Sequence, residues 1–512
     1  MQKQLSKPAK PSAAFSYIWL GIGFILSLFT FGKLNIPLAA WLYPLFLLRF
    51  VKTQHPLTGF IGVLLVYVID ALYWHYQVFG SLFSFFLVVL LILAIVQPLP
   101  YLLDWLLSSH WSKSWLGTLI FPLSWVLIEY LRTLVSPVGS IGTLAYSQYG
   151  NLPLLQLLSV TGLSGVVFIM TWLASMVNWA WQKQFAWRST HGGLLTYSSL
   201  LALILFAGGL RLALFPPVAQ TVRVASLTIA PHAMGQVQRQ DGDAIQAMID
   251  GKGSLGDRQK VQAAYAPLQD ELFTRSQNEA RNGAKIVVWP ETELFVLEEN
   301  LPKLKARAAR TASQSGIYLE LGVGVFIKDA PYTRNIALLF DPQGKLVWTY
   351  SKTHPVPSLD NSTPGSGILP FVDTPYGRIS NLICYDADFP SLALQGGQKH
   401  VDLLLDPSSD WAGIDPWHTQ NATYRAIENG YSLVRSTDGG LSIVVDYQGH
   451  VLAAEDYFTS DPEGITASVP VKGTLTIYSL VGDLFAYLCM AGLAGLIVFS
   501  VLDTRRRQRA TA

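Results

Sequence analysis

The strongest constraint on this chain is a series of apolar stretches, each close to the length that spans a bilayer. About 20 consecutive apolar residues in a helix cross the hydrocarbon core. Seven such stretches fall within the first 215 residues and an eighth near the C-terminus: 14–31, 35–50, 57–76, 80–103, 114–134, 156–181, 194–214 and 480–502. The first has no small-residue cleavage site before a polar mature sequence, so we interpret it as a span rather than a signal peptide. The sequence therefore predicts a membrane α-helical bundle.

Charged residues are concentrated in one part of the chain. They make up 14% of the 512 residues, against about 25% in a typical soluble protein. Residues 1–218 carry 14 of the 70 charged side chains, with a net charge of +8, and the other 294 residues carry −6. We expect a membrane domain of about seven helices (1–218), a soluble domain (219–478), and a final helix with a basic tail (479–512). No basic face for nucleic acid is indicated.

Lysine and arginine in short loops predict the orientation, because cytoplasmic loops are enriched in them. The basic residues that flank the spans are Lys3, Lys7, Lys10, Lys52, Lys113, Lys183, Arg188, Arg505, Arg506, Arg507 and Arg509. All of them fall on one side if seven spans precede the soluble domain and one follows it. That side is the cytoplasm, so residues 219–478 are expected to be extracytoplasmic.

Two charged residues lie near the end of the fifth stretch. Glu129 and Arg132 are three positions apart and would share one helix face. One interpretation is a structural ion pair near the interface. The other is that they hold the following loop, residues 135–153, against a lipid-binding surface.

The cysteine count limits the chemistry. Cys384 and Cys489 are the two cysteines, which excludes a disulfide-rich scaffold and any CxxC zinc or redox site. The sequence also has no clustered metal-ligand spacing and no phosphate-binding glycine loop. We therefore expect no metal and no cofactor.

From residue 221 the pattern changes to short β-rich runs between amphipathic helices, which favours a layered α/β domain. The expected strands are 222–227, 285–289, 318–325, 336–340, 379–383, 401–405, 432–435 and 443–446. The expected helices are 260–282, 301–314, 389–395 and 417–429. Residues 235–259 are interpreted as a polar excursion or mobile loop.

Three residues just past expected strands could act together. They are Glu291, Lys352 and Cys384. A carboxylate can take the proton of a thiol nucleophile, and a lysine can lower the thiol pKa and stabilise an oxyanion. Taken singly, they could equally be a loop glutamate, a surface lysine and a packing cysteine. Their order and local contexts favour the catalytic interpretation.

Those contexts resemble a known family. Val287-Val-Trp-Pro-Glu-Thr-Glu, Tyr350-Ser-Lys-Thr-His and Ile383-Cys-Tyr-Asp-Ala-Asp-Phe-Pro are similar to the three catalytic motifs of the nitrilase, or carbon–nitrogen hydrolase, superfamily. The predicted layout, with seven spans, then a soluble domain, then one span, narrows the resemblance to the apolipoprotein N-acyltransferases. Further matching segments extend it over almost the whole chain: Glu129-Tyr-Leu-Arg132, Gly142–Gln148, Ser409-Asp-Trp411, Gln420, Arg425–Glu428, Arg435–Gly439 and Thr476–Asp483.

The resemblance implies an αββα sandwich with a Glu-Lys-Cys triad. It also implies a multi-pass protein of the bacterial inner membrane, with its catalytic domain on the periplasmic side. The expected activity is ping-pong acyl transfer from a phospholipid, through a thioester on Cys384, to the N-terminal diacylglyceryl-cysteine of lipoproteins. Glu291 would be the base, while Lys352 and a backbone N–H, that of Tyr385, would hold the oxyanion.

The chain departs from the family around this triad. Thr228-Ile-Ala-Pro231 replaces a Gln-Gly-Asn-Ile segment, and a tryptophan that usually follows it has no counterpart. The second active-site glutamate is represented by Asp360, which would orient the triad or the incoming amine. Asp386 stands where the family has Glu after the Cys-Tyr pair. We therefore expect the triad chemistry to be kept and the acceptor surface to differ.

Other side chains are candidates for contact with lipid. Trp411, Trp417, Tyr385, Tyr146 and the 135–153 loop would line a lipid entrance, or else serve as core and interfacial aromatics. His418 could pair with Cys384, although its place in an expected helix favours packing or capping.

Two other functions remain open from the sequence. One is a membrane-anchored amidase of the same superfamily, with water as the acceptor. The other is a non-catalytic lipid-binding paralogue. Nothing in the sequence requires more than a monomer.

Overall fold

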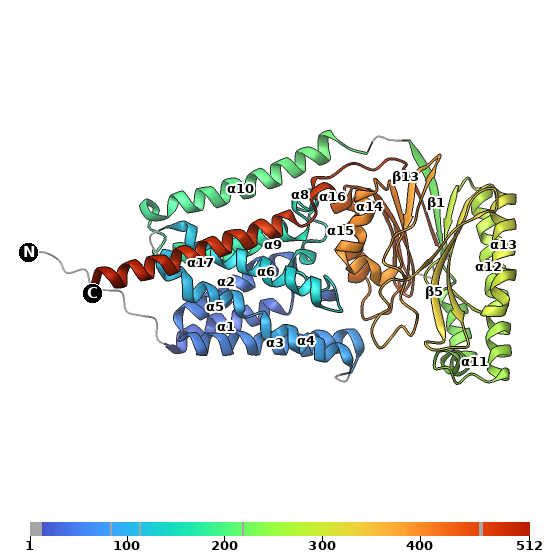
Figure 1. Ribbon diagram of the computed structural model, residues 1–512, viewed down its shortest axis with the longest axis horizontal. Coiled ribbons are helices and arrows are strands. Elements are labelled where there is room, and N and C mark those ends of the chain that lie inside the picture. Colours follow the sequence, from blue (N-terminus) through green and yellow to red (C-terminus); the bar gives the residue numbers. More distant parts are fainter. Residues whose placement is uncertain (1–12, 82–83, 112–113, 218–219, 460–463, 512) are drawn as a thin grey trace, which may run out of the picture.

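The structure, a computed structural model, describes residues 13–511 except 82–83, 112–113, 218–219 and 460–463. Lys3, Lys7, Lys10 and Lys113, which entered the orientation argument, lie outside the described residues. A helical bundle and a layered α/β domain are joined end to end (Figure 1). Helix α10 leads into the domain and α17 leads back out of it. The domain boundaries at 218 and 478 stay predictions.

The bundle contains long helices and short connecting ones. Its helices are α1 (Ala13–Ser27), α2 (Pro37–Thr53), α3 (Pro56–Phe79), α4 (Phe85–Val96), α5 (Leu99–Leu107), α6 (Ile120–Val135), α7 (Leu152–Leu155), α8 (Leu158–Thr161), α9 (Leu163–Gln182), α10 (Trp187–Leu214) and α17 (Leu484–Thr511). Within the described residues, six helical segments are long and apolar enough to cross a membrane. They match the third to eighth predicted spans. The first two predicted spans form α1 and α2, which have 15 and 17 residues.

The sixth predicted span is interrupted at Gly162. Helix α8 ends there and α9 begins, because Gly162 has a left-handed φ of 60°. A Cβ on Gly162 would lie 2.5 Å from the ring of Tyr478. Glycine therefore allows the turn and a close approach to the start of the final helical segment.

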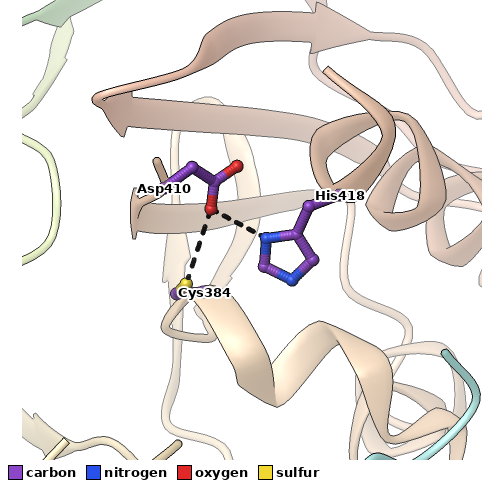
Figure 2. Close-up of side chains that lie close together, drawn as sticks. All are labelled: Cys384, Asp410 and His418. Atoms are coloured by element: carbon purple, nitrogen blue, oxygen red, sulfur yellow. Dashed lines mark hydrogen bonds and ion pairs between the residues drawn. The ribbon is translucent and has the colours of Figure 1, made fainter. Parts of the chain in front are cut away.

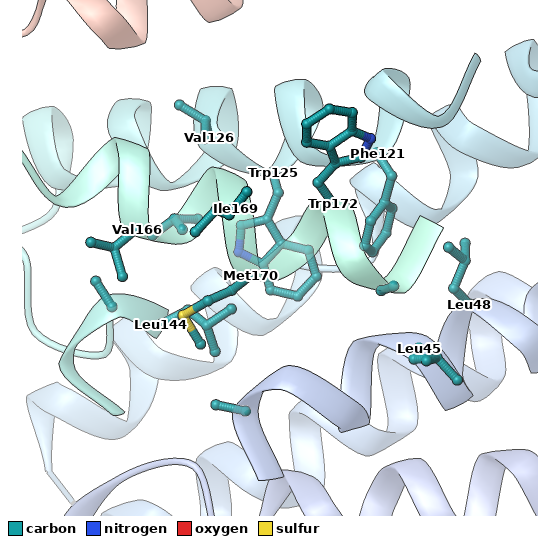
Figure 3. Close-up of a cluster of buried hydrophobic side chains, with 14 of the residues drawn as sticks. Leu45, Leu48, Phe121, Trp125, Val126, Leu144, Val166, Ile169, Met170 and Trp172 are labelled. Atoms are coloured by element: carbon teal, nitrogen blue, oxygen red, sulfur yellow. The ribbon is translucent and has the colours of Figure 1, made fainter. Parts of the chain in front are cut away.

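The bundle core forms where α2, α6 and α9 pack together (Figure 3). Leu48 of α2, Trp125 of α6 and Trp172 of α9 are all buried there. This burial fixes α6, and with it the start of the 135–153 loop.

The α/β domain is an αββα sandwich. One sheet has the order β13-β1-β2-β4-β5-β6 with β3 beside β4, and the other has β12-β11-β10-β9-β8-β7. The strands are β1 (Thr221–Leu227), β2 (Ile286–Val288), β3 (Leu294–Leu297), β4 (Tyr318–Phe326), β5 (Thr333–Phe340), β6 (Leu346–Ser351), β7 (Phe371–Thr374), β8 (Gly377–Asn381), β9 (Leu403–Ser409), β10 (Ser432–Asp438), β11 (Leu441–Val445), β12 (Val451–Asp456) and β13 (Gly464–Pro470). One apolar core fills the space between the sheets.

Helices cover both outer faces of the sandwich. They are α11 (Pro231–Ile249), α12 (Leu255–Arg281), α13 (Leu301–Ser315), α14 (Pro390–Gln398), α15 (Trp417–Asn429) and α16 (Ile477–Val481). Helices α12 and α13 lie on the face away from the bundle, and α14 and α15 lie on the face towards it (Figure 1). The expected strands and helices all correspond to elements of the structure.

The prediction that residues 235–259 form a polar loop is wrong. Most of this segment is helix α11, and its end begins α12. Val237, Ala244, Ile245 and Met248 are buried, and their spacing places them on one helical stripe. A narrow stripe among many polar residues is sufficient because α11 packs along α12.

Candidate active site

Strand direction brings the three candidate residues to one edge of the sandwich. β2 runs parallel to β4, and β6 has the same direction because both β4 and β6 are antiparallel to β5. Glu291 follows β2 and Lys352 follows β6, so both lie at the same edge of the first sheet. Cys384 follows β8 of the second sheet. The Glu291 N–H donates to the Ser408 carbonyl on β9 at 3.3 Å, which joins the two edges.

Glu291 and Lys352 form a buried ion pair. The Lys352 Nζ lies 2.6 Å from Glu291 Oε1 and 3.1 Å from Asp360 Oδ2. Asn335 Nδ2 donates to the same Glu291 oxygen at 2.6 Å, and the Ser409 N–H donates to Oε2 at 2.9 Å. Burial alone would lower the pKa of Lys352, but Glu291, Cys384 and Asp360 raise it well above its ordinary value. The lysine is therefore held as a cation.

Cys384 begins a single 3-10 turn in a strained conformation. Its φ of 51° lies in the left-handed region, which costs a non-glycine residue about 1–2 kcal/mol. Its N–H donates to Asp406 Oδ1 at 2.8 Å, which holds the turn. Sγ lies 3.7 Å from the Ser409 carbonyl oxygen and 4.0 Å from Asp410 Oδ1.

The surroundings of Cys384 keep its thiol protonated. Burial and the charge of Glu291 raise the pKa of Cys384 well above its ordinary value, against a smaller lowering by Lys352. The thiol form is a weak nucleophile. Attack by this sulfur therefore needs a base close to the reacting atoms.

Asp386 ties the lysine segment to the cysteine turn. Its carboxylate is fully buried and accepts from Tyr350 Oη at 2.8 Å, from the Thr353 N–H at 3.2 Å and from the His354 N–H at 2.8 Å. It also accepts from the Ile383 N–H at 3.3 Å. Since Lys352 lies between these donors in the chain, Asp386 sets the position of Lys352 relative to Cys384.

A buried charged cluster lies beside Cys384 on its other side (Figure 2). His418 Nδ1 is 2.7 Å from Asp410 Oδ1, and Nε2 is 2.8 Å from Asp388 Oδ2. Burial would lower the pKa of His418, but Asp410 and Asp388 raise it to about 9. Arg435 Nη1 lies 2.6 Å from Asp406 Oδ2, and Nη2 lies 3.5 Å from Asp410 Oδ1.

The cluster does not suit a metal ion, although ligand atoms of Cys384, Asp410 and His418 lie within 4.8 Å of one another. Both ring nitrogens of His418 already contact carboxylates, and Arg435 Nη2 is 3.0 Å from Nδ1. A buried guanidinium this close repels a second cation. We interpret the group as a hydrogen-bonded cluster.

A cavity of about 520 Å³ joins the three candidate residues to the bundle. Glu291, Lys352 and Cys384 line it together with Asp360 and Asn335. Bundle side chains supply an apolar part of its lining: Trp74, Val78 and Phe79 of α3, Phe86 and Leu90 of α4, and Val138 and Ile141 of the 135–153 loop. A ligand that is polar at one end and apolar along its length matches this lining.

Three aromatic residues of the domain line the cavity and contact the bundle. Trp411 Nε1 donates to the Val78 carbonyl at 2.9 Å, and Tyr385 Oη donates to the Pro137 carbonyl at 2.8 Å. The Trp417 ring lies 5.7 Å from the ring of Trp74, centre to centre. These side chains therefore help to dock the domain on α3 and the 135–153 loop.

Glu129 and Arg132 bond to the 135–153 loop rather than to each other. Glu129 Oε1 accepts from the Leu144 N–H at 3.2 Å and from Trp125 Nε1 at 2.9 Å, and Arg132 Nη2 donates to Thr143 Oγ1 at 3.0 Å. No ion pair joins the two side chains, both of which lie in the described part of α6. They line a second cavity of about 210 Å³.

Tyr146 belongs to this loop, is buried, and is absent from the lining of the larger cavity. Its hydroxyl lies 2.7 Å from Ser140 Oγ and accepts from Arg425 Nη2 at 3.1 Å. Its position favours a structural role over contact with a ligand.

Sequence reasoning missed Asn335 and the bonds that join the charged cluster. It considered His418 as a packing or capping residue or a partner of Cys384, and the structure places its ring between Asp410 and Asp388. Asn335 is a polar residue inside an apolar strand, and its bond to Glu291 depends on the sheet order. The cluster draws on two parallel strands: Asp406 lies on β9, Asp410 directly follows β9, and Arg435 lies on β10. A cue was present in the sequence, because Asp406 and Arg435 come at or just after the ends of the expected strands 401–405 and 432–435, although both lie within β9 and β10 in the structure.

Two family models match the chain. The model described as "Carbon-nitrogen hydrolase" matches residues 258–473, and the one described as "Apolipoprotein N-acyltransferase N-terminal domain" matches residues 22–176. Together they cover the α/β domain and most of the bundle.

Curated relatives match over most of their length. An apolipoprotein N-acyltransferase of Geobacter metallireducens is 26% identical over 76% of this chain and 74% of its own length. One of Haemophilus influenzae is 25% identical over 83% of this chain and 81% of its own length. Among solved structures, an amidase of Nesterenkonia sp. is 17% identical, covers 53% of this chain and 97% of its own, and has a TM-score of 0.38.

Proposed function

We propose that this chain, which belongs to the apolipoprotein N-acyltransferase family of the carbon–nitrogen hydrolase superfamily, transfers a fatty acyl group from a phospholipid to the N-terminal diacylglyceryl-cysteine of lipoproteins. The observation that carries the proposal is the shared cavity. Cys384 lies in its polar part, and bundle side chains from α3 and α4 form its apolar part. An acyl chain along those helices would bring its ester carbonyl to the sulfur.

The first half-reaction forms a thioester. Glu291 takes the proton of the Cys384 thiol as the sulfur attacks the ester carbonyl of the phospholipid. Lys352 and the Tyr385 N–H hold the oxyanion that develops on the carbonyl oxygen. When the intermediate collapses, Glu291 returns the proton to the departing glyceryl oxygen, and the lysophospholipid leaves.

The second half-reaction transfers the acyl group to nitrogen. The α-amine of the diacylglyceryl-cysteine attacks the thioester carbonyl, and Glu291 accepts its proton. The bond between the carbonyl carbon and sulfur then breaks, and Glu291 returns the proton to the departing Cys384 sulfur, which restores the thiol. Asp360 and Asn335 hold the Glu291–Lys352 pair during both steps, since both contact it directly. The thioester itself supplies the activated acyl group, so the transfer needs no nucleotide.

We propose that the active site is on the extracytoplasmic, periplasmic side of the inner membrane. Lys52 lies in the last turn of α2, Lys183 directly follows α9, Arg188 lies in the first turn of α10, and Arg505 lies near the end of α17. Helix α17 runs from the α/β domain to the far end of the bundle (Figure 1). Basic residues are retained in the cytoplasm, so the opposite end carries the domain. A monomer holds every residue used here.

The test is acyl transfer by the purified chain in detergent. It is incubated with phospholipid and a synthetic diacylglyceryl-cysteine peptide, and the peptide mass is followed. We expect a gain of one fatty acyl group on the free α-amine and none when that amine is acetylated. Release of free fatty acid or ammonia from an amide, without peptide acylation, would instead identify an amidase. No turnover with either substrate would identify a non-catalytic paralogue.

A further inference from the structure

The charged cluster beside Cys384 has no part in the mechanism above, although one of its carboxylates is close to the sulfur. Asp410 Oδ1 lies 4.0 Å from Sγ, within the range of a weak S–H hydrogen bond. The same oxygen contacts His418 Nδ1 at 2.7 Å (Figure 2). These contacts form a short chain from the nucleophile to a buried imidazole.

We propose that Asp410 and His418 are positioning residues: Asp410 orients the Cys384 thiol and keeps it protonated, and His418 fixes Asp410 for that task. The proposal rests on the proposed function, because it assumes that Cys384 is the nucleophile. It assigns no proton transfer to either residue.

The geometry around Ser409 and Asp410 supports this positioning role. Ser409 and Asp410 connect the thiol to the base, since the Ser409 carbonyl faces Sγ at 3.7 Å and its N–H donates to Glu291 Oε2 at 2.9 Å. The Asp410 N–H donates to the Asp438 carbonyl at 2.8 Å. With its side chain bound to His418, Asp410 is held at both ends. The pair therefore sets the separation between thiol and base.

The charge of Asp410 acts on the thiol as well. Burial would raise the pKa of Asp410, but His418 and Arg435 lower it below its ordinary value, so the side chain is a carboxylate. A negative charge 4.0 Å from sulfur opposes formation of a thiolate. Asp410 thus adds to the effects of burial and of Glu291 in keeping the resting enzyme in the thiol form, which resists oxidation. The other charged groups near the sulfur are Glu291, Lys352 and Arg435. The protonated His418 is also near it, because its ring nitrogen lies within 4.8 Å of Sγ.

The cluster also reaches the membrane domain. His418 Nε2 contacts Asp388, whose carbonyl accepts from both the N–H and the Oγ of Ser140 in the 135–153 loop, each at 2.8 Å. Arg425 donates to the hydroxyl of Tyr146 in the same loop, and this hydroxyl also bonds to Ser140 Oγ. The contacts from Cys384 through Asp410 and His418 to Asp388 therefore end where the domain meets the bundle.

The test measures how the alkylation of Cys384 by iodoacetamide depends on pH, with the modified peptide identified by mass so that Cys489 does not interfere. In D410N the pH at which the alkylation rate is half-maximal should fall by about one unit or more. At a given pH below that midpoint, alkylation should then be about tenfold faster. D410S removes the same charge and is measured if D410N does not fold. The matched control is D402N, because Asp402 is also buried but lies at the opposite end of β9.

The second readout compares the rate of acyl-enzyme formation in the two single variants with the rate in the double variant. D410N and H418Q should each slow it by about tenfold at unchanged phospholipid KM, and the double variant should be no slower than the worse single one. The proposal would be overturned if D410N and D410S showed the same pH dependence of alkylation as D402N. It would also be overturned if the double variant slowed acyl-enzyme formation by the product of the two single effects. Alkylation needs no phospholipid, so its result stands even if acyl transfer is absent.

Discussion

Asp386 offers the sharpest test of how the site is held together. Its carboxylate is fully buried, and each oxygen accepts from a backbone N–H: Oδ2 from Thr353 and Oδ1 from His354. In D386N one oxygen becomes an NH2 group, which cannot accept. Because backbone N–H groups cannot turn away, at least one of them loses its partner in either amide orientation.

The size of the effect follows from these bonds. A buried donor left without an acceptor costs about 1–3 kcal/mol, and the remaining bond also weakens with loss of the charge. We expect a loss of about 3 kcal/mol, which lowers the apparent Tm by about 6–12 °C in a domain of this size. Since Lys352 immediately precedes Thr353, we also expect acyl-enzyme formation to slow by about tenfold.

The assay is thermal unfolding in detergent together with the rate of acyl-enzyme formation. The matched control is D373N, because the Asp373 side chain is 74% exposed and pairs with Arg378 at the surface. Exposed pairs contribute about 0–1 kcal/mol, so D373N should keep both properties close to wild type. Equal behaviour of D386N and D373N would refute the view that Asp386 positions the lysine segment.

Three further predictions test the site, the cavity and the buried cluster. K352M should slow acyl-enzyme formation by at least about 10²-fold, because it removes the charged group that we propose as an oxyanion donor; retention of wild-type rates would exclude that role. L90W should shift the preferred donor towards shorter acyl chains, measured by competition between phospholipids, since Leu90 lines the apolar part of the cavity; an unchanged preference would place the chain elsewhere. The pKa of His418 is raised from 6.5 to about 9, so its stabilising contribution is complete below pH 6.5 and is lost as pH rises to about 9. H418Q should flatten this part of the stability–pH curve, and a curve with the same slope would contradict it.

The main elements follow from local sequence patterns. Buried strands such as β4 and β9 are apolar runs between turn residues, so periodicity locates them. Helix α11 was missed because its buried stripe is narrow and its other positions are polar, so its burial depends on α12. Gly162 divides a continuous apolar stretch at its left-handed φ, and a side chain there would clash with Tyr478, which lies more than 300 positions away in the chain.

The candidate site, like the fold, could be predicted from the sequence only in part. Strand ends and local motifs indicated Glu291, Lys352 and Cys384, and the structure lines one cavity with all three. Asn335 and the cluster around His418 could not be predicted, because their partners meet only after both sheets have paired. The ion pair considered for Glu129 and Arg132 is replaced by bonds to the 135–153 loop, since the loop folds back over α6.

The central claim is that Cys384 carries the acyl group, and the mass of the intact protein tests it most directly. The purified chain is incubated with phospholipid in detergent without an acceptor, beside a C384A variant. The account predicts a mass increase of one fatty acyl group on the wild type alone, removed by hydroxylamine. An unmodified wild type whose thiol still reacts with iodoacetamide, or an acyl adduct on C384A, would contradict it.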